Sequence, residues 1–303
     1  MRMLKYLIAV PVVASVAVTH VSQRTGAGSS RTVAEVLATL PILEGRVPAY
    51  YAAGAHDEAR RVQQMMEAAA DYYPAAIGAA LVVELALIGP NEWRSLNANP
   101  VPYTHFIPGV RPGPPYIVWV PLGRGHALDG FVQQVSRKSA AVRRLVSSPE
   151  ELSDRFVALA AFHELGHFYA RNGFGDPPGW LSEFVASYLA YAFFSERYPE
   201  DARIWEVVCA AFVEHVAPKP RVSGDFHAGQ LAENYAWYLG SLQVHVNNAH
   251  RQHGPGFLPK LKAAWQDRKS AGDMRPALRL LEQVAPGFHD WVKAHHGGME
   301  AGL

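Results

Sequence analysis

The stretch His163-Glu164-Leu165-Gly166-His167 is the most informative part of this chain of 303 residues. On an α-helix, His163 and His167 lie one turn apart on the same face, so both imidazoles can reach one metal ion. Glu164 then lies beside that ion, where its carboxylate can take a proton from a water molecule. This spacing is typical of a catalytic zinc site in a helix.

The flanking residues predict the helix that such a site needs. Ser148 can cap the helix, Pro149 suits its first position, and Glu150-Glu151 favours the positive end of the helix dipole. Asn172-Gly173 predicts a stop, so we expect one helix over about 149–172. Because the helix is apolar, burying two histidines and a glutamate in it without a metal would be costly. The alternative interpretation is a surface helix that carries the pattern by coincidence.

A catalytic zinc site usually has three protein ligands and one water, so the motif needs a third ligand. The metzincin continuation is excluded, because Ala170 and Gly173 stand where that class has Gly and His. Asp176 lies in a Pro/Gly loop and is interpreted as a turn residue. Glu183 is the better candidate, since it is the only acid over 177–194 and a lone carboxylate in an apolar segment needs a partner. The alternative is a first-turn glutamate favoured by the helix dipole.

The two segments together resemble a known family. The zinc motif followed by Trp180-Leu181-Ser182-Glu183-Phe184-Val185-Ala186-Ser187-Tyr188 is similar to the gluzincins, zinc peptidases. It is most similar to their M1-like (peptidase MA-like) branch, whose second motif reads roughly W-L-x-E-G-x-A. The resemblance implies that His163, His167 and Glu183 bind one Zn²⁺ ion and that Glu164 is the general base.

The resemblance has a limit that concerns the substrate. Aminopeptidases of this branch carry a G-x-M-E-N segment before the zinc helix, which holds the amino terminus of the substrate. This chain has no such segment there, and Gly298-Met299-Glu300 lies at the wrong end and lacks the Asn. The spacing from His167 to Glu183 is also slightly shorter than usual in the family. The resemblance therefore implies the chemistry without singling out an aminopeptidase.

A further candidate group would stabilise the negative charge that builds on the carbonyl oxygen during peptide hydrolysis. In the family that the chain resembles, this group is a Tyr on a later helix. Tyr235 and Tyr238 are the candidates, three residues apart on neighbouring parts of one face. Tyr235 is preferred for its surroundings, and the alternative is that both are core aromatics. Ser187, one turn after Glu183, is either a hydrogen-bond partner of a ligand or an ordinary helix residue.

The N-terminus has the pattern of an export signal. Arg2 and Lys5 precede an uncharged apolar run of 12 residues over 7–18, and Ser15-Val16-Ala17 offers a small-residue cleavage site. We expect a signal peptide over 1–25 and an exported protein, periplasmic or secreted. The run is shorter than the ~20 residues that span a bilayer. The alternative is an uncleaved N-terminal anchor, the only membrane contact expected.

The balance of charged residues limits the kinds of binding partner that we expect. The chain has 28 basic and 27 acidic residues, so nothing indicates binding to nucleic acid or to a charged membrane surface. The expected partner is a peptide or protein substrate. The only cysteine, Cys209, lies in an apolar run and is predicted to be a buried thiol without a disulfide. Five late histidines are expected to be solvated, with an accessory metal site as the alternative: His245, His250, His253, His295 and His296.

Hydrophobic periodicity predicts an α+β fold. We expect a small N-terminal β-sheet with helices, then the zinc helix, then a mainly helical lobe, which is the zincin-like order. The lobes would cover 26–175, ending in the zinc helix, and 176–303, carrying the third ligand. Strands are predicted over 81–88 and 116–122, and by position the second would be the family's substrate-binding edge strand. Other helices are predicted over 29–40, 56–76, 129–146, 202–216, 228–248, 257–270 and 274–284.

The sequence therefore predicts an exported zinc metallopeptidase with one Zn²⁺ ion. Two alternatives stay open. One is a catalytically inactive zinc-binding module that binds a protein or peptide partner. The other is a metal-dependent hydrolase that uses the same residues on a non-peptide bond.

Overall fold

The computed structural model describes residues 32–96, 109–111, 114–175, 177–216, 232–271 and 275–296. Within these ranges, the side chains of 109–111, 232–235, 267–271, 275–276 and 294–296 lie outside the description. The predicted signal peptide and Asp176 also lie outside it.

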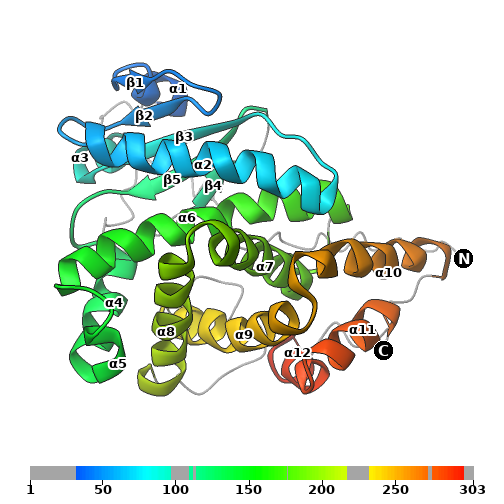
Figure 1. Cartoon of the computed structure of the whole chain (residues 1–303). Coiled ribbons are helices and arrows are strands. Elements are labelled where there is room, and N and C mark those ends of the chain that lie inside the picture. The colour runs from blue at the N-terminus through cyan, green and yellow to red at the C-terminus, as the bar shows by residue number, and fades with distance from the viewer. Residues whose placement is uncertain are drawn as a thin grey trace, which may run out of the picture.

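A five-stranded mixed sheet forms the upper layer of the molecule (Figure 1). The strand order is β1-β2-β3-β5-β4, in which β2, β3 and β5 are parallel and both edge strands are antiparallel. In chain order the strands are β1 (Ile42–Leu43), β2 (Ala49–Tyr51), β3 (Val83–Ile88), β4 (Gly109–Arg111) and β5 (Tyr116–Pro121).

The prediction that 116–122 forms the edge strand is wrong. β5 lies between β3 and β4, with Val118 opposite Leu85 on one side and Val110 on the other. The edge strand beside β5 is β4, which has only three residues and therefore shows no periodicity in the sequence. The strong β-formers of β5 fit this interior position better than an edge.

Helices cover both faces of the sheet, because successive strand residues point to opposite sides. Leu85, Leu87 and Val118 join the main core, which also contains residues of α2 (His56–Ile77) and α6 (Pro149–Phe174). Ala86, Ile88 and Ile117 form a smaller cluster with residues of α1 (Val33–Leu37) and α3 (Pro90–Leu96). The long helix α6 thus lies under the sheet with one face buried against it.

The remaining helices lie on the other side of α6 from the sheet (Figure 1). One hydrophobic core continues from the sheet through α6 into these helices, so residues on both sides of position 175 share it. The architecture is α+β, as predicted. These helices are α4 (Ala127–Lys138), α5 (Ala140–Arg143), α7 (Gly179–Arg197), α8 (Pro199–His215), α9 (Ala232–His253), α10 (Phe257–Ala271), α11 (Arg275–Val284) and α12 (Phe288–His296), with the 3-10 turn η2 (Gly254–Gly256) before α10.

One predicted helix is divided in the structure. The helix predicted over 129–146 is broken at Ser139, whose extended backbone ends α4 and whose hydroxyl accepts the Val142 N–H at the start of α5. A serine can replace a helical hydrogen bond in this way, which a hydrophobic pattern does not register. The short elements β1, β2, α3 and α12 were not predicted at all.

The histidine prediction is also partly wrong. His253 is exposed, but His245 and His250 are half-buried on α9. His245 packs on Phe288 and Trp291, and burial lowers its pKa and that of His250. The side chains of His295 and His296 lie outside the described part. Cys209 is buried, as predicted, and burial raises the pKa of its thiol.

Candidate metal centre

The helix that carries the zinc motif begins as predicted and ends later. Ser148 is extended and its hydroxyl accepts the Glu151 N–H at 3.1 Å, with Pro149 in the first helical position. The predicted stop at Asn172-Gly173 is wrong, because α6 continues to Phe174 and is closed by Gly175 with φ 67°. Gly173 has a packing role instead, since a Cβ there would meet Ile77 at 1.9 Å.

Three side chains from two helices converge on one point. The Nε2 atoms of His163 and His167 are 3.1 Å apart, and Glu183 of α7 places its Oε2 3.1 Å from the first and 3.6 Å from the second. Two ligands on a tetrahedral zinc, each ~2.0–2.1 Å from the metal, are about 3.3 Å apart. The triangle therefore has the size that one zinc ion requires. Two imidazoles and one carboxylate also leave a fourth position open, as in catalytic sites.

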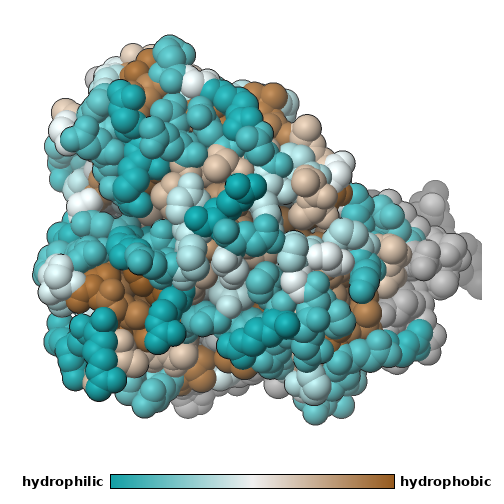
Figure 2. All heavy atoms as spheres, in the orientation of Figure 1, coloured by the Kyte–Doolittle hydropathy of each residue, from teal (hydrophilic) through white to brown (hydrophobic). Residues whose placement is uncertain are grey.

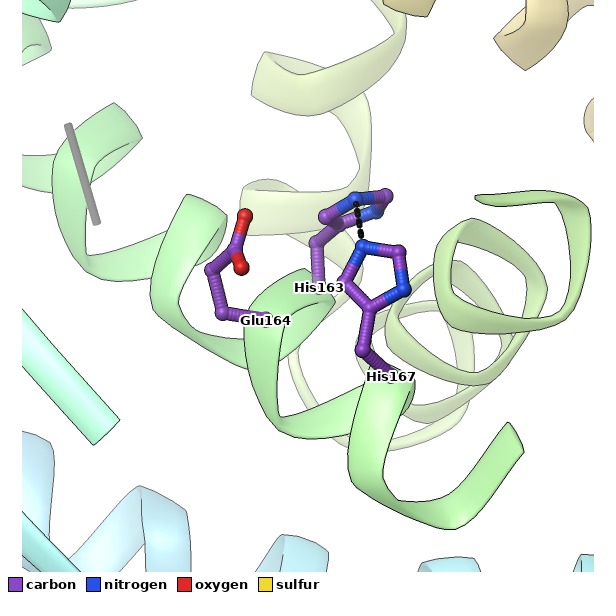
Figure 3. Close-up of side chains that lie close together, drawn as sticks. All are labelled: His163, Glu164 and His167. Atoms are coloured by element: carbon purple, nitrogen blue, oxygen red, sulfur yellow. Dashed lines mark hydrogen bonds between the residues drawn. The ribbon is translucent and has the colours of Figure 1, made fainter. Parts of the chain in front are cut away.

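Glu164 lies beside this triangle. Its carboxylate and the two imidazole nitrogens lie within 4.8 Å of one another, so these three residues also form a metal-capable group. Figure 3 shows the two imidazole rings meeting each other while the Glu164 carboxylate stands next to them. Glu183 is the better-placed candidate for a third ligand, because its Oε2 closes the tighter triangle with both Nε2 atoms. Glu164 remains free for a different role.

Burial determines the electrostatics of the cluster. His163, Glu164 and Glu183 are each at most 4 % exposed. Burial raises the pKa of Glu164 well above its usual range, and the negative charge of Glu183 raises it further. Burial lowers the pKa of His167 to about 4, which keeps the imidazole neutral and able to bind a metal. Among the described residues, the Oε2 of Glu164 has no hydrogen-bond partner, a costly state for a buried carboxylate.

A close helix crossing brings the third ligand to the histidines. Gly166 lies between the two halves of the motif, and a Cβ on it would come within 2.7 Å of the Ala186 Cα and 2.8 Å of its carbonyl oxygen. Only a glycine therefore allows α6 and α7 to approach this closely. The approach places Glu183, one turn before Ser187, directly against the motif.

The other nitrogen of each imidazole faces a serine of α7. Ser187 Oγ lies 3.1 Å from His163 Nδ1, and Ser182 Oγ lies 3.0 Å from His167 Nδ1. The contact of Ser187 fits the first of its two interpretations, a hydrogen-bond partner of His163. Ser182 was missed, and nothing in the sequence distinguishes it from an ordinary first-turn serine.

Aromatic side chains cover His163 on the side that faces α8. The Trp205 ring lies 6.5 Å from the imidazole at 27° and stacks on Phe156 at 5.0 Å. Its indole N–H donates to the buried Gln243 Oε1 at 2.7 Å, which fixes the ring. His167 is the most accessible ligand, with 12 % of its side chain exposed against 2 % for His163. Solvent therefore approaches the cluster from the His167 side.

The structure describes the side chain of only one of the two tyrosines that the sequence suggests for stabilising the oxyanion. Tyr238 is buried on α9, and burial together with the nearby charge of Glu183 raises its pKa well above the usual range. The Tyr238 ring packs against Trp291, with the ring centroids 5.0 Å apart. Tyr235 lies in the first turn of α9, and its side chain is outside the described part.

A cavity of about 580 Å³ lies elsewhere, at the carboxyl ends of the parallel strands. Its lining includes Gly54, Gly89 and Gly123 from the loops after β2, β3 and β5, and Asp154 and Ala158 from α6. At 100° per residue, these two α6 positions lie about 140–180° around the helix from His163. The cavity therefore faces the sheet side of α6, away from the metal cluster.

Comparison with protein-family models, with curated proteins and with solved structures gives no match for this chain. Any functional assignment therefore rests on the chemistry and geometry of the site.

Proposed function

We propose that this protein is a zinc-dependent metallopeptidase of the gluzincin type, with a zincin-like fold. The observation that carries the proposal is the triangle of His163, His167 and Glu183, with donor atoms 3.1–3.6 Å apart. Beside it, Glu164 has a buried carboxylate oxygen without a partner among the described residues. A ligand set with an open position next to a free base supports hydrolysis rather than a structural zinc, which usually has four protein ligands.

Each residue has a role in this reaction. Zinc held by such a set acts as a Lewis acid and lowers the pKa of water toward 7. Glu164 accepts a proton from the attacking water at its carboxylate and passes it to the nitrogen of the leaving amine as the C–N bond breaks. Tyr235 or Tyr238 donates a hydrogen bond to the former carbonyl oxygen as it becomes negative. His167 remains neutral, which burial favours.

The proposal includes export and a peptide or protein substrate outside the cytoplasm. It rests on the N-terminal sequence pattern, which lies outside the described residues. Among the helices that are described, none has both the length and the apolar character to cross a bilayer.

Replacing the base tests the mechanism directly. Glu164→Gln should keep one zinc per chain, measured by elemental analysis, and should lower peptide hydrolysis about 10²- to 10⁴-fold. Glu150→Gln is the matched control, because Glu150 lies in the exposed first turn of the same helix. Cleavage of a broad peptide library is read by mass spectrometry.

The outcomes separate the candidate functions. Hydrolysis by Glu164→Gln at the wild-type rate would contradict the mechanism. Tight binding of one zinc without any peptide cleavage would favour the inactive binding module. Cleavage of an ester or another non-peptide bond alone would favour the second alternative.

The oxyanion role is tested with the two tyrosines. Tyr238→Phe should lower kcat by about 10²- to 10³-fold, with a smaller change in KM, if its hydroxyl acts mainly in the transition state. Tyr235→Phe is the matching variant three residues earlier on α9. A large loss of kcat in Tyr235→Phe alone would transfer the role to Tyr235.

A further inference from the structure

Each imidazole of the cluster has its two nitrogens in different surroundings. The Nε2 atoms face each other and Glu183, whereas each Nδ1 lies 3.0–3.1 Å from a serine hydroxyl of α7. Ser187 is 1 % exposed and Ser182 is half-buried, so water does not readily replace Ser187. The same helix thus supplies the third ligand and a partner for both histidines.

The chemistry of imidazole gives these contacts a direction. A neutral imidazole has one N–H donor and one acceptor nitrogen, and a metal needs the acceptor. When Nε2 binds the metal, Nδ1 carries the hydrogen and donates it to the serine Oγ. In that arrangement each serine supports the tautomer and the ring orientation that metal binding requires.

We propose that Ser182 and Ser187 are positioning residues, which hold His167 and His163 in the metal-binding tautomer. This inference rests on the proposed metal site but not on peptide hydrolysis. The spacing Ser182-Glu183-x-x-x-Ser187 places Ser187 one turn beyond the ligand on the same face, under His163. Ser182 precedes Glu183 directly and reaches His167 on its other side.

The two acceptors are hydroxyls and carry no charge. With neutral imidazoles, the carboxylate of Glu183 and a divalent ion sum to a formal charge of +1. Carboxylate partners at the same places would reduce this charge and make the imidazoles stronger donors to the metal. The serines orient the ligands while leaving the ion's charge available to polarise a fourth ligand.

The test measures metal binding by the full chain without reference to activity. The dissociation constants of Zn²⁺ and Co²⁺ are determined by competition with a chelator, and the visible absorption of the Co²⁺ protein is recorded. Ser182→Ala and Ser187→Ala should each weaken binding about 10- to 100-fold and change the Co²⁺ spectrum. Ser182→Thr, which keeps the hydroxyl, should restore both properties.

Ser195→Ala is the matched control, because Ser195 is a half-buried serine on the same helix whose side chain interacts with Tyr191. It should bind both metals as the wild type does. If Ser187→Ala does not fold, Ser182→Ala and Ser182→Thr decide the question, since Ser182 is only half-buried. Wild-type affinities and spectra in the alanine variants would overturn the positioning role.

The result separates this inference from the proposed function. Metal binding that is unaffected by the serine variants would overturn only the positioning role. Weakened binding in a protein that cleaves no peptide would support it while the peptidase proposal failed. A wild-type chain that binds neither metal would overturn both.

Discussion

Two regions of α6 hold their ionisable side chains in different surroundings, one exposed to solvent and one buried. The N-terminal end is exposed, where Asp154 accepts two hydrogen bonds from Arg124 at 2.6 and 2.8 Å and Arg155 pairs with Asp201 of α8. Figure 2 shows that hydrophilic residues cover most of the molecular face that is turned to the viewer in Figure 1. Further along the helix, His163 and Glu164 are buried, and the two histidines have their printed polar contacts with each other and with α7.

The difference shows what burial demands of a charge. At the exposed end, water can replace a lost partner, so the ion pairs add little stability. At the buried end water is largely excluded, and a carboxylate without a partner costs several kcal/mol unless a cation or a proton compensates it. The same helix is therefore tolerant at one end, and at the other its buried carboxylate needs a compensating proton or cation. Four predictions test this contrast.

Removal of the metal should have the largest effect. With free zinc at a thousand times its dissociation constant, the ion should stabilise the folded protein by about 4 kcal/mol. Chelation should therefore lower the free energy of unfolding by this amount, measured by denaturant titration. Glu183→Gln should lose most of this response, because the third ligand is gone. If the wild-type protein unfolded identically with and without zinc, the buried part of α6 would not depend on a metal for its stability.

Acid should destabilise the protein through His126, which caps α4 near the exposed end. Burial and then Arg124 lower the pKa of His126 to about 4, although Asp129 acts in the opposite direction. Because the folded pKa is below the unfolded value of about 6.5, the unfolded chain takes up the proton first. The stability is therefore complete above pH 6.5 and decreases by about 3 kcal/mol as the pH falls to 4.

His126→Asn provides the measurement, since asparagine can also cap a helix. The free energy of unfolding should depend less on pH between 4 and 6.5 in this variant than in the wild type. Equal slopes would show that His126 does not titrate with a lowered pKa. His245 and His250, whose pKa values are also lowered by burial, contribute to the slope of both proteins equally.

The helix crossing gives the third prediction. Gly166→Ala should cost about 1–3 kcal/mol, because the new methyl group meets the backbone of Ala186, which cannot yield as a side chain does. It should also weaken zinc binding, since separating α6 from α7 moves Glu183 away. Gly130→Ala is the control on α4, where Gly130 is exposed and a Cβ would meet nothing within 4 Å. That variant should gain about 0.5–1 kcal/mol from helix propensity.

The exposed ion pair should have the smallest effect. The Arg124 and Asp154 side chains are 39 % and 50 % exposed. A double-mutant cycle with Arg124→Gln and Asp154→Asn should give a coupling of about 0.2–1 kcal/mol at low salt. The coupling should shrink in 1 M salt, where the Debye length is about 3 Å. A larger, salt-independent coupling would mean that this end of α6 is not the tolerant one.

The parts of the fold that the sequence predicts well are long and periodic. The predicted bounds of α2 and α6 lie within a few residues of the observed ones, because capping residues and apolar spacing act locally. The strands β3 and β5 were also expected, but β4 and the order of the strands were not. The pairing of β5 with β4 joins segments that no local pattern connects, and β4 is too short to show a period.

The role of glycine gives a second lesson. Gly173 follows Asn172 and has the pattern of a helix stop, yet it serves the contact with Ile77 of α2, and Gly175 ends the helix. A glycine can mark either a left-handed backbone or a close approach, and its neighbours in sequence do not distinguish the two. His245 and His250 were misjudged for a similar reason, since the aromatic rings that bury them come from other helices.

The sequence alone determined the pair of histidines and the glutamate between them, because residues four apart on one helix share a face wherever that helix lies. It also indicated Glu183 as an acid that needs a partner. Only the tertiary structure decided that Glu183 meets both imidazoles, that Ser182 and Ser187 lie behind them, and that β4 is the edge strand beside β5. These contacts depend on how closely α7 crosses α6 at Gly166, and on strand pairing across the sheet. Such distances between separate elements are set by packing, which no local spacing encodes.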